Sequence, residues 1–149
     1  MGSALLAIHI LGAVLWVGGM AFALMVLRPS LAVLEPPQRL ALHAQVFRRF
    51  FLIIWHAMPL LLATGYGMVF GIYSGFGNVN PAVHTMHLLG LIMSAVFVYI
   101  VFSPWPAFRK ALEAGDRAAA GALADRIRKL ITFNLALGLL VVIIAPFGP

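Results

Sequence analysis

The chain contains no cysteine and very few charged residues. Of its 149 residues, 9% are charged and 63% are hydrophobic, whereas typical soluble domains have roughly 25% charged residues. The absence of cysteine excludes disulfides, thiolate metal sites and cysteine nucleophiles. A soluble domain of this length could not bury so much apolar surface, so we predict an integral membrane protein.

Acidic residues are much rarer than basic ones. The chain has four, and all of them fall between the apolar runs: Glu35, Glu113, Asp116 and Asp125. There is no paired carboxylate, no Ser-His-Asp pattern and no glycine-rich phosphate loop. These absences argue against hydrolytic chemistry, and the carboxylates are expected only to balance charge in the connections.

Four long apolar runs are present instead. They cover about residues 4–27, 50–73, 84–102 and 130–146, each near the roughly 20 residues that span 30 Å of hydrocarbon. Every backbone polar group must be satisfied inside the lipid, and the runs are too uniformly apolar for barrel strands. We predict an all-α integral membrane four-helix bundle, with residues 1–149 forming a single transmembrane domain.

Several local signals predict where the helices begin and end. The segment after Pro36-Pro37 places Leu40, His43, Phe47 and Phe50 on one side, so the second helix is expected to begin near residue 37. An interfacial amphipathic stretch is the alternative. Asp116 resembles an N-cap for a helix that runs from about residue 117 into the fourth span. The prolines of Ser103-Pro104-Trp105-Pro106 should end or kink the third helix.

The positive charges are unevenly distributed. All ten Lys and Arg residues lie between the first and second runs or between the third and fourth. The positive-inside rule therefore predicts that both termini lie on the non-cytoplasmic side. We expect a multi-pass protein of a bacterial inner membrane, with the lipid bilayer as its surroundings. No nucleic-acid partner is expected, because the basic residues are not interleaved with exposed aromatic residues.

The histidines are the candidates for chemistry, since ionisable groups inside a membrane are costly and are usually functional. His9 should lie about 8 Å, and His87 about 5 Å, below the outer edge of the membrane. His56 enters from the opposite side, roughly 8 Å above the inner edge. His43 is expected to be cytoplasmic or interfacial, and His84 to lie at the outer rim.

Small residues accompany the two histidines that share a leaflet. At helical spacing, His9 lies in line with Gly12 and Trp16, and His87 with Gly90 and Ser94. The main prediction is a haem b site, in which His9 and His87 ligate the iron and electrons pass to a membrane or periplasmic redox partner. The predicted cofactor-binding residues are His9, His87, Gly12, Trp16, Gly90 and Ser94, with His56 as the ligand of a second centre.

Three alternatives stay open. A buried neutral imidazole can simply be satisfied by a backbone carbonyl or a Ser/Thr hydroxyl. His84 and Met86 offer imidazole and thioether, a ligand pair suited to copper. The Gly67-to-Gly71 GxxxG motif could instead mark a cofactor-free subunit that packs in a homo-oligomer or against a larger membrane complex.

The order of several short motifs resembles the CopD-like family and the related HemJ-type protoporphyrinogen oxidases. The first span, with His9 ahead of Trp16 and Gly18-Gly19, carries the resemblance. It continues in Arg48-Arg49-Phe50, Pro59 with Thr64-Gly65, and the segment 134–138, and so covers most of the chain.

The resemblance implies a four-helix bundle in which the residue matching His9 takes part in haem b binding in HemJ-type members, which are oxidoreductases. CopD members are associated with copper uptake or resistance. HemJ-type proteins carry a lysine near the start of the third helix, where this chain has Met86 and His87. This difference argues against porphyrinogen oxidation but leaves haem ligation open.

Overall fold

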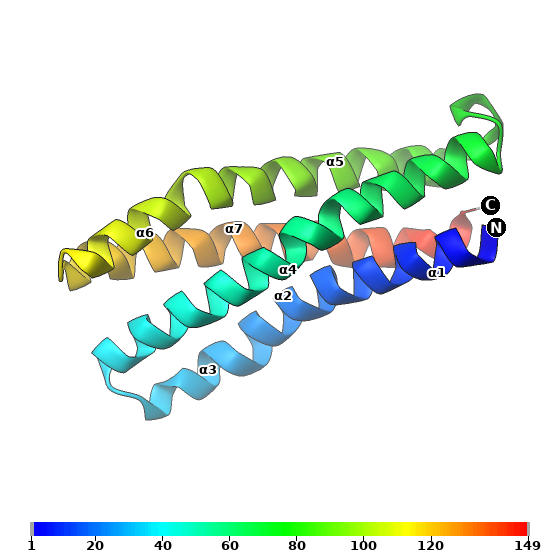
Figure 1. The fold of residues 1–149 in the computed structure, drawn as a ribbon. Coiled ribbons are helices and arrows are strands. Elements are labelled where there is room, and N and C mark those ends of the chain that lie inside the picture. Colours follow the sequence, from blue (N-terminus) through cyan, green and yellow to red (C-terminus); the bar gives the residue numbers. More distant parts are fainter. Residues whose placement is uncertain (1, 149) are drawn as a thin grey trace.

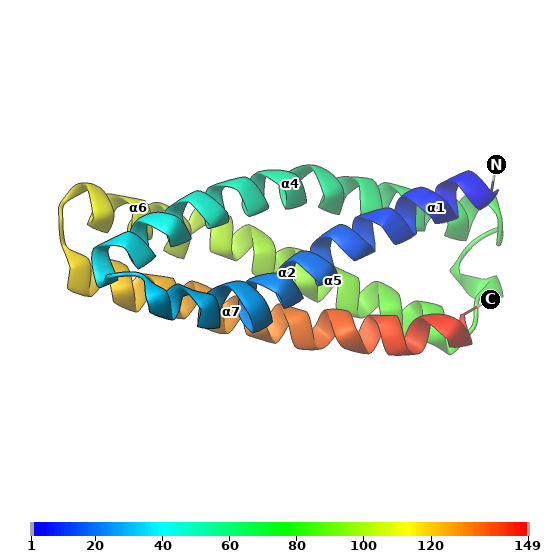
Figure 2. The ribbon, with the colours of Figure 1, turned by 90° about the horizontal axis from the view of Figure 1, so that it is seen from below.

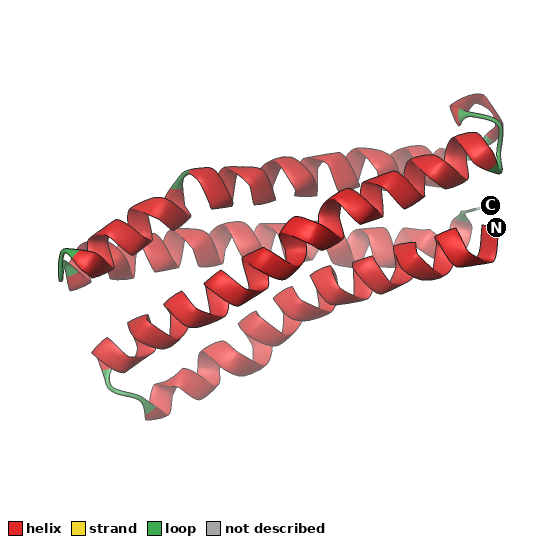
Figure 3. Cartoon of the chain, in the orientation of Figure 1, coloured by secondary structure: helices red, strands yellow, loops and turns green. Residues whose placement is uncertain are grey.

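The structure, a computed structural model, describes residues 2–148 and consists of four long helical rods (Figures 1 and 3). Within these residues there is no strand. Each rod is long and apolar enough to cross a membrane: Gly2–Val33, Pro36–Gly71, Pro81–Glu113 and Arg117–Phe147. The prediction of an all-α four-helix membrane bundle is confirmed.

The first rod is subdivided along its length. It consists of α1 (Gly2–Ala13), the π-helical turn η1 (Val14–Gly18), α2 (Gly19–Phe22), a second π-helical turn η2 (Ala23–Leu27), α3 (Arg28–Ser30) and the 3-10 turn η3 (Leu31–Val33). π-helical turns are one of the recognised causes of helix bending. The rod crosses the bundle obliquely, with α1 on α4 and with α2 and η1 reaching α7 (Figure 2).

The other three rods are more regular. The second is the single helix α4 (Pro36–Gly71), which contains Pro59. The third is α5 (Pro81–Phe102) followed by α6 (Pro104–Glu113), and the fourth is α7 (Arg117–Ile144) with the 3-10 turn η5 (Ala145–Phe147). The break at Ser103 confirms the effect expected from the prolines there. The helix continues without a break from Pro36 to Gly71, so the segment after Pro36 belongs to the same helix as the second span.

Local hydrogen bonds explain where these helices begin. The Asp116 side chain accepts a hydrogen bond from the Ala119 backbone N–H at 2.9 Å, and Gly115 before it has φ of +69°, so the predicted N-cap is confirmed. Asn80 caps α5 in the same way by accepting from the N–H of Ala82 at 3.0 Å. Side-chain caps of this kind satisfy N–H groups that a helix start leaves without partners.

The stripe of small residues on the first rod is the interface with α4. A Cβ added to Gly12 would lie 3.0 Å from Leu61, and one added to Gly19 would lie 2.4 Å from Phe50. The residue numbers of the contacts on α4 decrease as those on the first rod increase, as expected for antiparallel helices. These glycines therefore allow close packing of the first rod on α4.

Aromatic side chains fill the interior between the rods. Phe47 and Phe51 of α4 stack at 5.5 Å between ring centroids, and Phe51 meets Phe97 edge to face at 6.0 Å. Phe108 of α6 is fully buried beside them. Large apolar side chains on the outside of all four rods remain exposed, for example Leu11, Phe70, Phe102 and Ile143. A surface this apolar is expected where lipid tails cover the protein.

The two ends of the bundle differ in character. Both termini and the loop between α4 and α5 lie together at one end, which we call the terminal end (Figures 1 and 2). The connections 34–35 and 114–116 lie at the other end. We call it the basic end, because each of the ten Lys and Arg residues lies in the half of its rod that is nearer to these connections. His9, His84 and His87 belong to the terminal end.

Candidate functional site

His9 is held by α4 through its imidazole. Its Nδ1 atom lies 3.0 Å from the backbone carbonyl oxygen of Leu61 and 3.0 Å from the Thr64 hydroxyl oxygen. The ring also packs on Gly65, where an added Cβ would lie 3.2 Å from the His9 Cε1 atom. Thr64 is buried and donates its own proton to the Leu60 carbonyl at 2.8 Å. The ring position is therefore fixed by both helices.

These contacts also favour one tautomer of His9. A carbonyl oxygen can only accept a hydrogen bond, so the contact with Leu61 favours the tautomer that carries the proton on Nδ1. In the neutral imidazole, Nε2 then keeps its lone pair. A histidine whose other nitrogen donates to a backbone carbonyl is the usual arrangement for a metal ligand. His9 is thus oriented as a ligand would be.

Two further histidines face a common aromatic ring near the start of α5. The ring centroid of Phe76, in the 3-10 turn η4 (Phe76–Asn78), lies 5.6 Å from that of His84 and 4.9 Å from that of His87. Tyr66 of α4 meets His87 edge to face at 5.2 Å, and its hydroxyl lies 3.5 Å from the His87 Nε2 atom. Both imidazoles therefore point to one side of α5.

The chain is similar to a known protein family over most of its length. The family model described as "Copper resistance protein D", CopD, matches residues 44–147. The chain belongs to the CopD family. Neither the curated proteins nor the solved structures gave a match. The family resemblance inferred from sequence is confirmed, and the chain is a multi-pass membrane protein of copper-resistance type.

Family membership bears on the choice between haem and copper. The match covers α4 from residue 44 onward and all of α5, α6 and α7, and its description refers to copper. Neither haem nor electron transport is supported by it. The copper alternative of the sequence analysis therefore fits this CopD-family chain better than the haem reading.

The predicted iron ligands His9 and His87 have different neighbours. His9 contacts Leu61, Thr64 and Gly65, whereas His87 contacts Tyr66 and Phe76. Their helices differ as well, because α1 packs mainly on α4 and α5 packs mainly on α7. Shared ligation of one iron by these two residues stays a prediction.

The residues expected to make room for a porphyrin mostly have packing contacts. Leu61 occupies the space at Gly12, and Trp16 is buried with its ring 6.0 Å from that of Phe97. Ser94 is buried and donates to the Gly90 carbonyl at 2.8 Å. Only Gly90 among the predicted glycines has open space where a Cβ would be.

Met86 lies on a different side of α5 from His84. Its Cε atom lies 3.5 Å from the position of an added Cβ on Gly148, beside the C-terminus, whereas His84 faces Phe76. Helical geometry explains the separation, because two residues correspond to about 200° of rotation and three residues to about 300°. His84 and His87, rather than His84 and Met86, share a face.

The remaining histidines lie outside this end. His56 is exposed on α4 and bonds its own helix, with Nδ1 2.8 Å from the Leu52 carbonyl oxygen. His43 is half-buried near the basic end and stacks on Phe47 at 5.4 Å. Within residues 2–148, no group of three or more His, Asp or Glu side chains is arranged to hold a metal ion.

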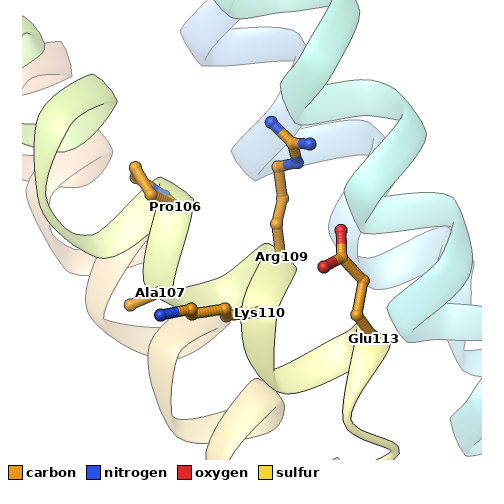
Figure 4. Close-up of a pocket in the computed structure, with 5 residues that line it drawn as sticks. All are labelled: Pro106, Ala107, Arg109, Lys110 and Glu113. Carbon is orange, nitrogen blue, oxygen red and sulfur yellow. The ribbon is translucent and has the colours of Figure 1, made fainter.

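Two hollows lie at the basic end. One runs along α6 and is lined by Pro106, Ala107, Arg109, Lys110 and Glu113 (Figure 4). In this view Arg109 and Glu113 project on the α4 side of the helix and Lys110 projects on the other. The second lies between α4 and α7. Both are remote from the histidines of the terminal end.

Sequence reasoning missed the partners of the histidines. Thr64 was singled out only by the family resemblance, and Tyr66 and Phe76 were not singled out at all. A weak signal was available for Thr64, because hydroxyl groups in apolar spans can hydrogen-bond to a neighbouring helix. No comparable signal pointed to Phe76, since its position depends on how the loop after α4 folds back.

Proposed function

We propose that this CopD-family protein binds copper at the terminal end of the bundle and passes it into the membrane interior. The observation that carries this proposal is the shared face of His84 and His87, one helical turn apart and against the same Phe76 ring. Residues three apart on a helix have Cβ atoms about 5–6 Å apart, a spacing that lets two imidazoles reach one ion.

The ligand chemistry supports copper as the cargo. Imidazole nitrogen suits copper, and Cu(I) also accepts thioether sulfur. Cu(I) is stable with two or three ligands, so a pair of imidazoles is a sufficient donor set. An ion that must move on has to be bound strongly enough to enter and weakly enough to leave. A two-histidine site at the rim meets that requirement better than a closed site with four ligands.

Further soft donors lie deeper in the bundle. His9 offers its Nε2 lone pair at the same end, and Met20, Met58 and Met93 are buried between the helices. We propose that these side chains receive copper from the rim. Met25, which is 70% exposed, faces outward and is not part of this route.

The distribution of charge suggests the direction. The positive-inside rule favours the basic end as cytoplasmic, so the histidines of the terminal end would meet copper on the outer side of the membrane. Cysteine-specific labelling of single-cysteine variants is simple here, because the chain has no cysteine of its own. Labelling of a cysteine at Asn78 but not at Ala114 by an impermeant reagent in intact cells would support this orientation. The reverse pattern would contradict it.

A competition titration tests the copper proposal. Purified protein in neutral detergent is titrated with Cu(I) against a coloured Cu(I) chelator, and the His84→Ala/His87→Ala double variant is compared with wild type. Loss of two ligands should weaken binding by at least about tenfold. His56→Ala is the matched control, because His56 is exposed and bonds only its own helix. Equal copper binding by wild type and the double variant would disprove this site.

A second candidate, haem b ligation, is favoured by one observation. His9 has the donor pattern of a metal ligand, with Nδ1 on a carbonyl and Nε2 free. Bound haem would supply electron transfer, and His9 would be its ligand, with His87 as the predicted partner. Protein purified from cells given ample haem should then be red, with a Soret band that His9→Ala alters. A colourless preparation would exclude haem.

A further inference from the structure

The hollow between α4 and α7 at the basic end is remote from His9, His84 and His87 of the terminal end. It has a volume of about 360 Å³. The residues that α4 contributes are Pro36, Arg39, Leu40 and His43, and those from α7 include Arg117, Gly121, Ala124, Asp125 and Arg128. Spacings of three and four residues place each set on one face of its helix. Arg28 of α3 completes the wall.

Four guanidinium groups line this space against a single carboxylate. Asp125 is already engaged, because it accepts from Arg128 Nε at 2.8 Å and lies 3.4 Å from Lys129 Nζ. Arg39 donates to the carbonyl oxygens of Leu34 and Ala32, at 2.6 and 3.2 Å. The positive charge of the hollow is therefore not neutralised by its own acidic residue.

Arg28 and Arg117 are the two uncommitted cations. Within the described residues 2–148, neither side chain has a hydrogen bond or an ion pair, and both are exposed. They approach the hollow from different rods, α3 and α7. Like charges held beside one hollow repel each other, and an anion placed between them would remove that repulsion.

The lining of the hollow also includes small and apolar residues. Leu40 and Ala124 contribute to it, and a Cβ added to Gly121 would meet nothing within 4 Å. With a volume of about 360 Å³, the hollow can accept a group larger than a water molecule.

We propose that this hollow binds a phosphate group, with Arg28 and Arg117 as its main donors. Planar guanidinium forks pair with phosphate oxygens through two parallel hydrogen bonds, which makes arginine the preferred residue for phosphate recognition. The phosphate can belong to an anionic lipid headgroup at the membrane surface or to a free phosphate compound in the adjacent water. The copper proposal plays no part in this inference.

Thermal stability measures the binding. Purified protein in neutral maltoside detergent is heated with increasing inorganic phosphate or pyrophosphate, or with short-chain phosphatidylglycerol. Chloride at matched ionic strength and short-chain phosphatidylcholine serve as references. A ligand of the folded state raises the unfolding temperature in proportion to its saturation. A rise with phosphatidylglycerol alone identifies a lipid site, and a rise with phosphate or pyrophosphate identifies a site for free phosphate.

Variants assign the effect to this hollow. Arg28→Gln/Arg117→Gln should weaken the apparent affinity by at least about tenfold, because charge-assisted hydrogen bonds to phosphate are lost. The matched control is Arg109→Gln/Lys110→Gln, which removes the same charge from the other hollow at this end. Gly121→Leu should also abolish the rise in unfolding temperature with phosphate. The leucine side chain would fill the open space at position 121 and leave every charge in place.

Three results would overturn the proposal. The first is the absence of any rise with all three phosphate compounds. The second is an equal rise in wild type and in the Arg28→Gln/Arg117→Gln variant. The third is a loss of apparent affinity in the Arg109→Gln/Lys110→Gln control that equals the loss in Arg28→Gln/Arg117→Gln, which would show a general effect of positive charge.

Discussion

The Nδ1 atom of His9 and the carbonyl oxygen of Leu61 lie 3.0 Å apart and join the first rod of the bundle to α4. The Thr64 hydroxyl lies at the same distance from Nδ1. An imidazole buried in lipid without such partners would be costly. The contact thus explains both how a histidine is tolerated in the first span and why its Nε2 atom is left with a lone pair.

Removing this link should destabilise the bundle modestly. His9→Phe keeps an aromatic ring but loses the hydrogen bond to α4, and interhelical hydrogen bonds in membranes contribute about 0.6 kcal/mol on average, up to about 1.7. SDS-induced unfolding in mixed micelles measures the change. His56→Phe should be nearly neutral, because His56 bonds only Leu52 of its own helix. Equal losses in both variants would show that His9 has no special role in packing.

Adjacent glycines on the first rod provide a second test. An alanine at position 19 would place its Cβ 2.4 Å from the Phe50 ring, whereas one at position 18 would meet nothing within 4 Å. Gly19→Ala should therefore destabilise the protein by about 1–3 kcal/mol through overpacking. Gly18→Ala should be neutral or stabilise it by up to about 1 kcal/mol, because alanine favours helix. The same unfolding assay compares the two variants, and a similar response would contradict the described interface between the first rod and α4.

The fold could be predicted from the sequence because its determinants are local. Run length and uniform apolarity predict membrane helices, and single residues such as Asp116 and Pro104 mark helix ends through backbone hydrogen bonds within a few residues. The contact between His9 and Thr64 joins positions 55 residues apart. Helical periodicity gives the face on which His9 lies but not the helix that covers it.

The candidate site illustrates the same limit. The stripe of Gly12 and Trp16 is visible in the sequence, and small residues can serve a cofactor or a neighbouring helix. Leu61 occupies the space at Gly12, so close packing accounts for that glycine. The separation of Met86 from His84 was available from helical geometry. The approach of Phe76 to both histidines depends on the turn around Ser74 and Gly75, both with positive φ, and no periodic pattern predicts it.

A buried asparagine links the third and fourth rods. Asn134 is 2% exposed, its Nδ2 donates to the Met93 carbonyl at 3.0 Å, and its Oδ1 has no partner within the described residues. Asn134→Asp would bury an ionisable carboxyl group inside the span, so we expect a loss of several kcal/mol in the free energy of unfolding. Asn134→Leu removes both polar atoms and should change stability by less than about 1.5 kcal/mol. If SDS unfolding shows that Asn134→Leu is less stable than Asn134→Asp, the amide of Asn134 must have a further hydrogen-bond partner.

The ring of Phe76 holds the two imidazoles of the proposed copper site in place. Because its centroid lies 5.6 Å from His84 and 4.9 Å from His87, Phe76→Ala should free the His84 side chain and leave His87 with Tyr66 as its aromatic contact. Preorganised ligands lose less entropy on binding, so we expect Cu(I) affinity to fall by roughly threefold to tenfold, with the number of bound ions unchanged. Phe70→Ala is the control, since Phe70 contacts Phe76 at 5.6 Å and Tyr66 at 6.3 Å but neither histidine. Competition with a coloured Cu(I) chelator measures both variants. Unchanged affinity in Phe76→Ala would mean that the loop does not position the ligands, and a complete loss of binding would mean that it supplies more than position.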